Sequence, residues 1–188
     1  ELLSKVILNN KPEIVFHFAA QPLVLSGYQN PVETYETNII GTINLFEILR
    51  KTNFIKVIVI ITSDKVYKNY EWEYGYREND ELGGHDPYSA SKACVEIISN
   101  SYKNSFFDGN NINITTARAG NVIGGGDWSD YRLIPDVIRS IYHNKDLFIR
   151  YPKATRPWQH VVEPLFGYLE LARKSFLKEI KNGESFNF

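Results

Sequence analysis

Three side chains near the middle of the sequence have types and spacing suited to moving a proton on or off an alcohol. Tyr88 and Lys92 are four residues apart, so on a helix they project from the same face. A lysine ammonium beside a phenol stabilises the phenolate, so we expect a tyrosine that normally titrates at about pH 10 to exchange a proton near neutrality. Ser63 lies 25 residues before Tyr88, and its hydroxyl is expected to bond the same substrate hydroxyl. Such a set would transfer the proton while a hydride leaves the alcohol carbon.

Local patterns predict how these side chains are held. The run Val57–Ile61 is apolar without polar alternation, which is typical of a strand buried on both faces, and Ser63 follows its carboxyl end. The pair Asp86 and Pro87 predicts a helix start, because an N-cap acceptor precedes a residue already fixed near the helical φ. Without this context, the four-residue spacing would better fit a surface tyrosine and a solvated lysine.

Strands and helices alternate along the chain, which predicts an α/β fold with a parallel sheet. Buried strands are expected at 13–20, 56–62 and 112–117, a short strand at 147–149 and an incoming strand at 186–188. Helices are expected at 31–51, with Asn30 as the N-cap residue, at 87–107 and at 163–178. A further helix is expected after Pro135 and ends at about 144. Since active sites in such sheets gather at the carboxyl ends of the strands, Gln21, Ser63 and Asn121 are expected to converge.

Composition bounds the class of protein. The 188 residues are 43% hydrophobic and 14% aromatic with a net charge of -1, which fits one globular domain and gives no reason to expect nucleic acid. No apolar run reaches the roughly 18 residues of a membrane span. The single cysteine, Cys94, fits a reducing cytosol. Neither a membrane partner nor a metal site is predicted.

Longer motifs resemble those of a known family. They are Thr-Ser-Asp-Lys-Val-Tyr at 62–67, Leu-Gly-Gly-x-Asp-Pro-Tyr-Ser-x-Ser-Lys-Ala at 82–93, and Asn-Val-Ile-Gly-Gly-Gly-Asp-Trp at 121–128. From about residue 10 to its last residue, the chain resembles the extended short-chain dehydrogenase/reductases, the NAD-dependent nucleotide-sugar epimerases and dehydratases. The resemblance implies a Rossmann-like parallel sheet flanked by helices, with NAD as cofactor and a nucleotide sugar as substrate.

The resemblance also implies roles for residues at matching positions. Those at cofactor-binding positions are Ala19, Ala20, Gln21, Asn38, Tyr88 and Lys92. Those at substrate-binding positions are Asn121, Arg132 and Arg156. The small side chains of Ala19 and Ala20 suit a cofactor loop because they let the backbone approach a ligand. The guanidinium of Arg156 suits diphosphate oxygens, which it can bind bidentately. Asn38 fits helix packing equally well, and Arg156 alone would fit a surface ion pair.

Asp64 and Lys65, directly after Ser63, separate the possible reactions. Dehydration at C6 of a 4-keto sugar needs one group to remove the C5 proton and another to protonate the departing hydroxyl. By resemblance Asp64 is the acid and Lys65 the base, and the lysine points to the branch of the family that converts CDP-glucose to CDP-4-keto-6-deoxyglucose in deoxysugar biosynthesis. A lysine with a pKa of about 10.4 has to lose its proton first, which requires burial or a nearby cation.

The sequence contains no methionine, and no Gly-x-x-Gly-x-x-Gly follows an early strand. Because that loop cradles a pyrophosphate at a helix N-terminus, we expect it to lie upstream of Glu1 with the first strands. Residues 1–188 would then be the central part of one domain, with the start of the substrate-binding region at about 119–188. The isolated chain is expected to be inactive.

Three further expectations concern surfaces and alternatives. The helices at 31–51 and 87–107 carry apolar residues on more than one side, which predicts a homodimer or homotetramer. The aromatic-rich connection at 66–85 is expected either to cover a sugar or base or to pack on itself, and His17 to be a satisfied strand histidine. The alternative functions are another nucleotide-sugar 4,6-dehydratase, a 4-epimerase, or an inactive fragment.

Overall fold

Four parallel strands form the main sheet of the computed structural model, which describes residues 1–188. Their order is β1-β2-β3-β6, and their bounds are Ile14–His17, Val57–Ile61, Asn113–Arg118 and Ser185–Asn187. Every neighbouring pair is parallel, with Phe16 beside Val59 and Val59 beside Thr115. The predicted α/β fold and the incoming last strand are therefore confirmed.

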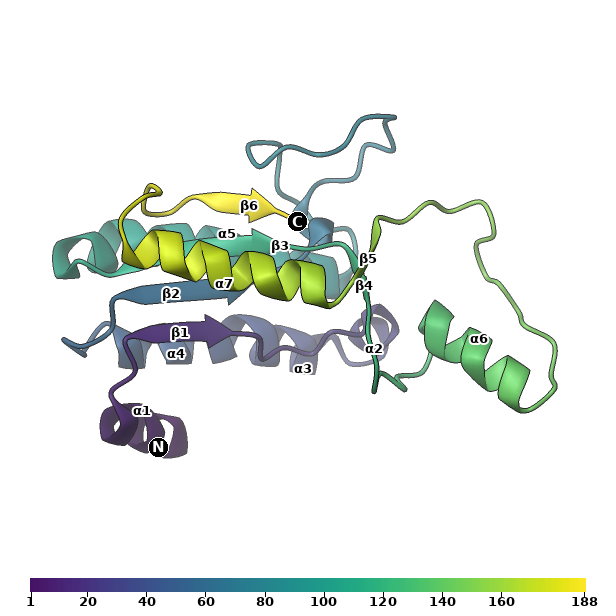
Figure 1. Cartoon of the computed structure of the whole chain (residues 1–188), viewed down its shortest axis with the longest axis horizontal. Helices are drawn as coiled ribbons and strands as arrows, with labels where there is room; N and C mark the ends of the chain where they lie inside the picture. The colour runs from purple at the N-terminus through teal and green to yellow at the C-terminus, as the bar shows by residue number, and fades with distance from the viewer.

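Helices cover both faces of this sheet (Figure 1). α4 (Gly41–Leu49) and α5 (Pro87–Tyr102) pack on one face, and α7 (Val162–Phe176) packs on the other. Successive side chains of a strand point to opposite faces, so Ile58 enters the first core and Val59 the second. Both are fully buried, which is why β2 shows no polar alternation in the sequence.

The remaining elements are shorter or lie outside the main sheet. The helices are α1 (Leu2–Asn10), α2 (Val24–Gln29), α3 (Pro31–Tyr35) and α6 (Leu133–Tyr142), with 3-10 turns at Asp64–Val66 and Asp108–Asn110. π-helical turns at Glu36–Ile40 and Lys103–Phe107 divide or end the two long helices predicted at 31–51 and 87–107. A second sheet pairs β4 (Asn121–Ile123) with β5 (Trp158–His160), neither of which was predicted. None of the helices is long and apolar enough to cross a lipid bilayer.

The two predicted helix caps behave differently. Asp86 caps α5 as predicted, with its Oδ1 accepting from the Ser89 amide at 3.0 Å and its Oδ2 from the Ser89 hydroxyl at 2.6 Å. Asn30 is the N-cap residue of α3, with Pro31 in the first turn as predicted, but its side chain makes no capping hydrogen bond. The unpredicted α2 ends at Gln29 with Asn30 as its C-cap residue, and the Asn30 amide donates to the Ser26 carbonyl at 2.8 Å.

The chain between β4 and β5 projects from the sheet as an arm that contains α6 (Figure 1). The short strand predicted at 147–149 is not formed, because no other strand lies beside that segment to pair with its backbone. After β5 the chain returns to the main sheet as α7 and β6. Within residues 119–188, α7 and β6 therefore belong to the main sheet and its cover.

Candidate active site

The end of β2 and the start of α5 bring the predicted proton-transfer groups together. Ser63 follows β2 and is 7% exposed, while Tyr88 and Lys92 on α5 are 9% and 6% exposed. Beyond β2, the amide of Thr62 donates to Ala117 at 2.8 Å and that of Asp64 to Ala119 at 3.0 Å. These bonds hold the motif beside β3, so Ser63 lies at a well-defined place on the carboxyl edge.

Burial dominates the electrostatics of Tyr88. It raises the pKa of the phenol, while the neighbouring Ser63 hydroxyl lowers that pKa. The charges of Asp64 and Asp86 raise the pKa, and the charge of Arg132 lowers it. Arg132 is the N-cap residue of α6 in the projecting arm, and its charge still acts on the phenol of Tyr88.

Lys92 does not bind the phenol of Tyr88. Its Nζ donates to the Ile61 carbonyl at 2.9 Å, and burial lowers its pKa to about 8, with Glu96 acting in the opposite direction. The expectation that Lys92 brings the Tyr88 pKa toward neutrality is therefore wrong for this structure, because burial outweighs every stabilising charge near the phenol. An ammonium has three donors, and only one of those of Lys92 is engaged, so two remain for a ligand.

Asp64 and Lys65 occupy one 3-10 turn directly after Ser63. The Ser63 hydroxyl donates to Asp64 Oδ1 at 3.0 Å and accepts from the Lys65 amide at 3.2 Å. Both residues are half-buried. An acid, a lysine and a serine hydroxyl thus lie side by side at the carboxyl end of β2.

Asn38 ties the loop after β1 to the helix of Tyr88. It is 2% exposed, and its side chain accepts from the Gln21 amide at 2.7 Å and donates to the Gln21 carbonyl at 3.1 Å and to Ser91 Oγ at 2.8 Å. It lies in the π-helical turn Glu36–Ile40, and such turns are frequent at functional sites. These contacts show Asn38 orienting the loop, while its contact with a cofactor stays a prediction.

The other residues of that loop and strand have separate environments. Ala19 is exposed and Ala20 half-buried, so backbone at this edge is open to a ligand. The Nε2 of His17 lies 2.9 Å from Thr42 Oγ1, and burial followed by the charge of Lys92 lowers the His17 pKa to about 4. His17 is therefore neutral near pH 7 and satisfied within the fold, as predicted.

The three predicted substrate residues lie on three different segments. Asn121 opens β4, Arg132 pairs with Asp127 at 2.7 Å, and Arg156 is exposed with its Nη1 donating to the Thr155 carbonyl at 2.6 Å. Asn121 pairs with Trp158 across β4 and β5, and the preceding residues are so close that a Cβ at Gly120 would lie 2.5 Å from Pro157. The structure therefore places Asn121 and Arg156 on adjoining segments and Arg132 nearer the phenol.

The aromatic connection at 66–85 packs on itself. The rings of Tyr67 and Tyr76 are 5.0 Å apart, those of Trp72 and Tyr76 are 5.2 Å apart, and those of Tyr70 and Trp72 are 5.2 Å apart. Of the two interpretations left open by the sequence, the self-packed connection is the one observed.

A buried ion pair beside the site was missed from the sequence. Glu96 and Arg118 lie 2.8 Å apart, and each side chain is 3% exposed. The sequence did carry one signal, because Glu96 is four residues beyond Lys92, as Lys92 is beyond Tyr88. Its partner on β3 had no comparable local signal.

Comparisons with known proteins give a consistent result. A family model described as "NAD dependent epimerase/dehydratase family" matches residues 1–187. A CDP-glucose 4,6-dehydratase of Salmonella typhimurium is 50% identical over the whole chain. A crystal structure of a dTDP-glucose 4,6-dehydratase from Bacillus anthracis in complex with NAD is 26% identical, with a TM-score of 0.82 over the whole chain. A UDP-glucuronic acid 4-epimerase from Bacillus cereus, 22% identical with a TM-score of 0.83 over 98% of the chain, shares the fold.

The matched relatives are longer than this chain. It covers 54% of the Salmonella protein, 54% of the Bacillus anthracis structure and 55% of the Bacillus cereus structure. The chain thus spans about half the length of these relatives.

Proposed function

The chain belongs to the NAD-dependent epimerase/dehydratase family, and from that premise we propose that the protein dehydrates CDP-glucose to CDP-4-keto-6-deoxyglucose. The observation that carries the proposal is the grouping of Ser63, Asp64 and Lys65 beside Tyr88 and the helix of Lys92. The 50% identity to a CDP-glucose 4,6-dehydratase supports the choice of nucleotide and of reaction.

The residues present fit part of an NAD site. The two unengaged donors of Lys92 suit hydroxyl acceptors of a ligand, and the exposed Ala19 leaves the backbone after β1 accessible. We propose that Ala19, Ala20 and Gln21 hold the cofactor with Asn38, Tyr88 and Lys92. When bound, NAD supplies the hydride acceptor and donor that the reaction requires.

Each proton in the proposed reaction has an assigned group. Tyr88 takes the proton of the sugar C4 hydroxyl as hydride leaves C4, and Ser63 bonds the same oxygen. Lys65 then takes the C5 proton, and Asp64 gives a proton to the C6 hydroxyl, which departs as water. Lys65 finally returns its proton to C5, and with the hydride from C4 now on C6 the product is a 4-keto-6-deoxy sugar. Ser63 and Arg132 act on the Tyr88 pKa in the direction that the first step needs, against burial, which raises that pKa overall.

Product analysis tests this proposal. The complete natural protein, incubated with NAD and CDP-glucose, is expected to give a sugar that has lost one water and carries a C4 ketone, as seen by mass spectrometry and NMR. UDP-glucose and dTDP-glucose under the same conditions are expected to react more slowly. A galactose-configured product of unchanged mass would instead identify a 4-epimerase, which needs only Ser63, Tyr88 and Lys92.

We further propose a homodimer or homotetramer in the cytosol, consistent with the lone free Cys94. Apolar side chains remain exposed on the helices that cover one face of the sheet, among them Val32 at 67%, Ile40 at 48% and Ile97 at 59%. An exposed apolar patch of this kind is typical of a protein interface. The same helices form the face opposite α7, so an interface there leaves the carboxyl edge of the sheet free.

The complete protein is therefore expected to be at least a dimer at micromolar concentration by light scattering. Ile97→Asp is expected to weaken association, because a carboxylate would be desolvated in the interface. Tyr74→Asp is the control, since Tyr74 lies in the connection at 66–85 and is 79% exposed. A monomeric parent protein would rule out this assignment.

A further inference from the structure

Glu96 lies one helical turn beyond Lys92 on α5, and the proposed chemistry assigns it no role. Tyr88, Lys92 and Glu96 follow at four-residue intervals and are 9%, 6% and 5% exposed, so they share one buried face. A charged side chain is seldom buried in this way unless it is paired. The partners of Glu96 therefore indicate what it holds in place.

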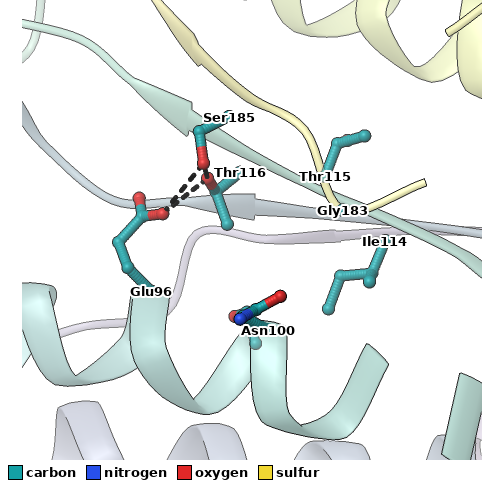
Figure 2. A pocket seen from close by; sticks show the side chains of 8 residues that line it. Glu96, Asn100, Ile114, Thr115, Thr116, Gly183 and Ser185 are labelled. Carbon is teal, nitrogen blue, oxygen red and sulfur yellow. Dashed lines mark hydrogen bonds between the residues drawn. The ribbon is translucent and has the colours of Figure 1, made fainter. Parts of the chain in front are cut away.

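Both carboxylate oxygens of Glu96 are engaged from the sheet. Oε1 accepts the Thr62 hydroxyl and Arg118 Nε, the latter at 3.0 Å. Oε2 accepts Arg118 Nη2 at 2.8 Å, the Thr116 hydroxyl at 2.7 Å and the Ser185 hydroxyl at 3.3 Å, the last two being visible in Figure 2. One carboxylate on the helix of Tyr88 thus joins the ends of β2, β3 and β6.

Arg118 extends the same network to the connection that follows the Ser63 motif. Its Nη1 donates to the Tyr67 hydroxyl at 2.8 Å and to the Glu78 carbonyl at 2.9 Å. A buried ion pair often contributes little more to stability than apolar residues of the same volume. Stability therefore does not explain the Glu96–Arg118 pair, and its role follows from the residues that it contacts.

Glu96 contacts the residue that directly precedes Ser63. α5 holds two successive residues at the end of β2, with Lys92 Nζ on the Ile61 carbonyl at 2.9 Å and Glu96 on the Thr62 hydroxyl. Ser63 is the next residue. Its distance from Tyr88 therefore depends on both anchors.

We infer that Glu96 is a positioning residue: held by Arg118, it binds Thr62 and thereby sets Ser63 against Tyr88 and Lys92. The inference rests on the proposed function in one respect, that Ser63 and Tyr88 act on the same sugar hydroxyl.

The charge of Glu96 gives a second, independent consequence. The titratable and charged groups around Lys92 are His17 on β1, Tyr88 and Glu96 on its own helix, and Arg118 on β3 behind Glu96. His17, with a pKa of about 4, is uncharged near pH 7. Glu96 is the charge that raises the Lys92 pKa against burial, so it favours the protonated ammonium.

Two matched variants test the positioning role in the complete protein. Thr62→Val and Thr116→Val each delete one hydroxyl from the Glu96 carboxylate, but only Thr62 adjoins Ser63. Both are expected to lower the Tm by a similar few degrees. Thr62→Val is expected to lower kcat by roughly 10-fold or more with little change in KM, because small misplacements of reacting groups are costly. Thr116→Val is expected to keep kcat within about 2-fold.

Crystal structures of the two variants provide a readout that does not depend on activity. Ser63 is expected to shift relative to Tyr88 in Thr62→Val and to stay in place in Thr116→Val. An unmoved Ser63 with equal kcat in both variants would overturn the inference. An inactive parent protein with the expected Ser63 shift would instead contradict the proposed function and leave the positioning role supported.

Glu96→Gln tests the charge. It keeps an acceptor for Thr62 and removes the negative charge, so Lys92 is expected to lose its proton at a lower pH. The alkaline limb of the kcat profile is then expected to move to lower pH, while that of Thr116→Val stays in place. An alkaline limb unchanged in Glu96→Gln would contradict the electrostatic role.

Discussion

Tyr88→Phe is expected to lower the turnover of the complete protein by about 10²- to 10⁴-fold, the usual contribution of a general acid or base. The variant loses the hydroxyl that would take the C4 proton and keeps the ring that fills the site. The parent ring is 9% exposed, so the fold is expected to survive the change. Substrate affinity, measured by equilibrium binding of CDP-glucose, is expected to remain close to that of the parent.

Tyr168→Phe is the control for this variant. Tyr168 is also buried, at 4% exposure, and burial followed by the charge of Tyr88 raises its pKa to about 12, so it is a second phenol near the site. It has no role in the proposed chemistry, and its loss is expected to change turnover by less than about 3-fold. Near-normal turnover in Tyr88→Phe would exclude the proposed base.

The second large effect is expected at Asp64 and Lys65, and it separates a dehydratase from an epimerase. Lys65→Ala lacks the base for the C5 proton, and Asp64→Asn lacks the acid for the departing hydroxyl. Both variants are expected to oxidise the sugar at C4 and then to lose water more slowly by about 10²-fold or more. The measurement is a single turnover with CDP-glucose, in which the absorbance of reduced cofactor persists and no dehydrated sugar appears.

Lys68→Ala is the control, because Lys68 lies three residues beyond Lys65 and its exposed side chain pairs with Glu81 at 3.0 Å. It is expected to form product at the rate of the parent protein. If Asp64→Asn and Lys65→Ala also did so, the two residues would be ordinary polar residues of the turn. The dehydratase proposal would then lose its main support.

The sequence by itself determined the features that depend on local geometry. β2 is evident from Val57–Ile61, because β-branched residues without polar alternation favour a strand buried on both faces. The start of α5 is evident from Asp86, because a capping carboxylate needs only an amide three residues away. The shared face of Tyr88 and Lys92 follows in turn from the helical period.

Only the tertiary structure decided how those side chains behave. The proton affinity of Tyr88 depends on burial under the rest of the chain, and Lys92 finds its partner at Ile61, 31 residues away. The segment at 147–149 failed as a strand because pairing requires a neighbour that sequence alone does not supply. Glu96 and Arg118 meet across 22 residues because α5 packs over β3, so the group that holds Ser63 in place exists only once the sheet and helix have assembled.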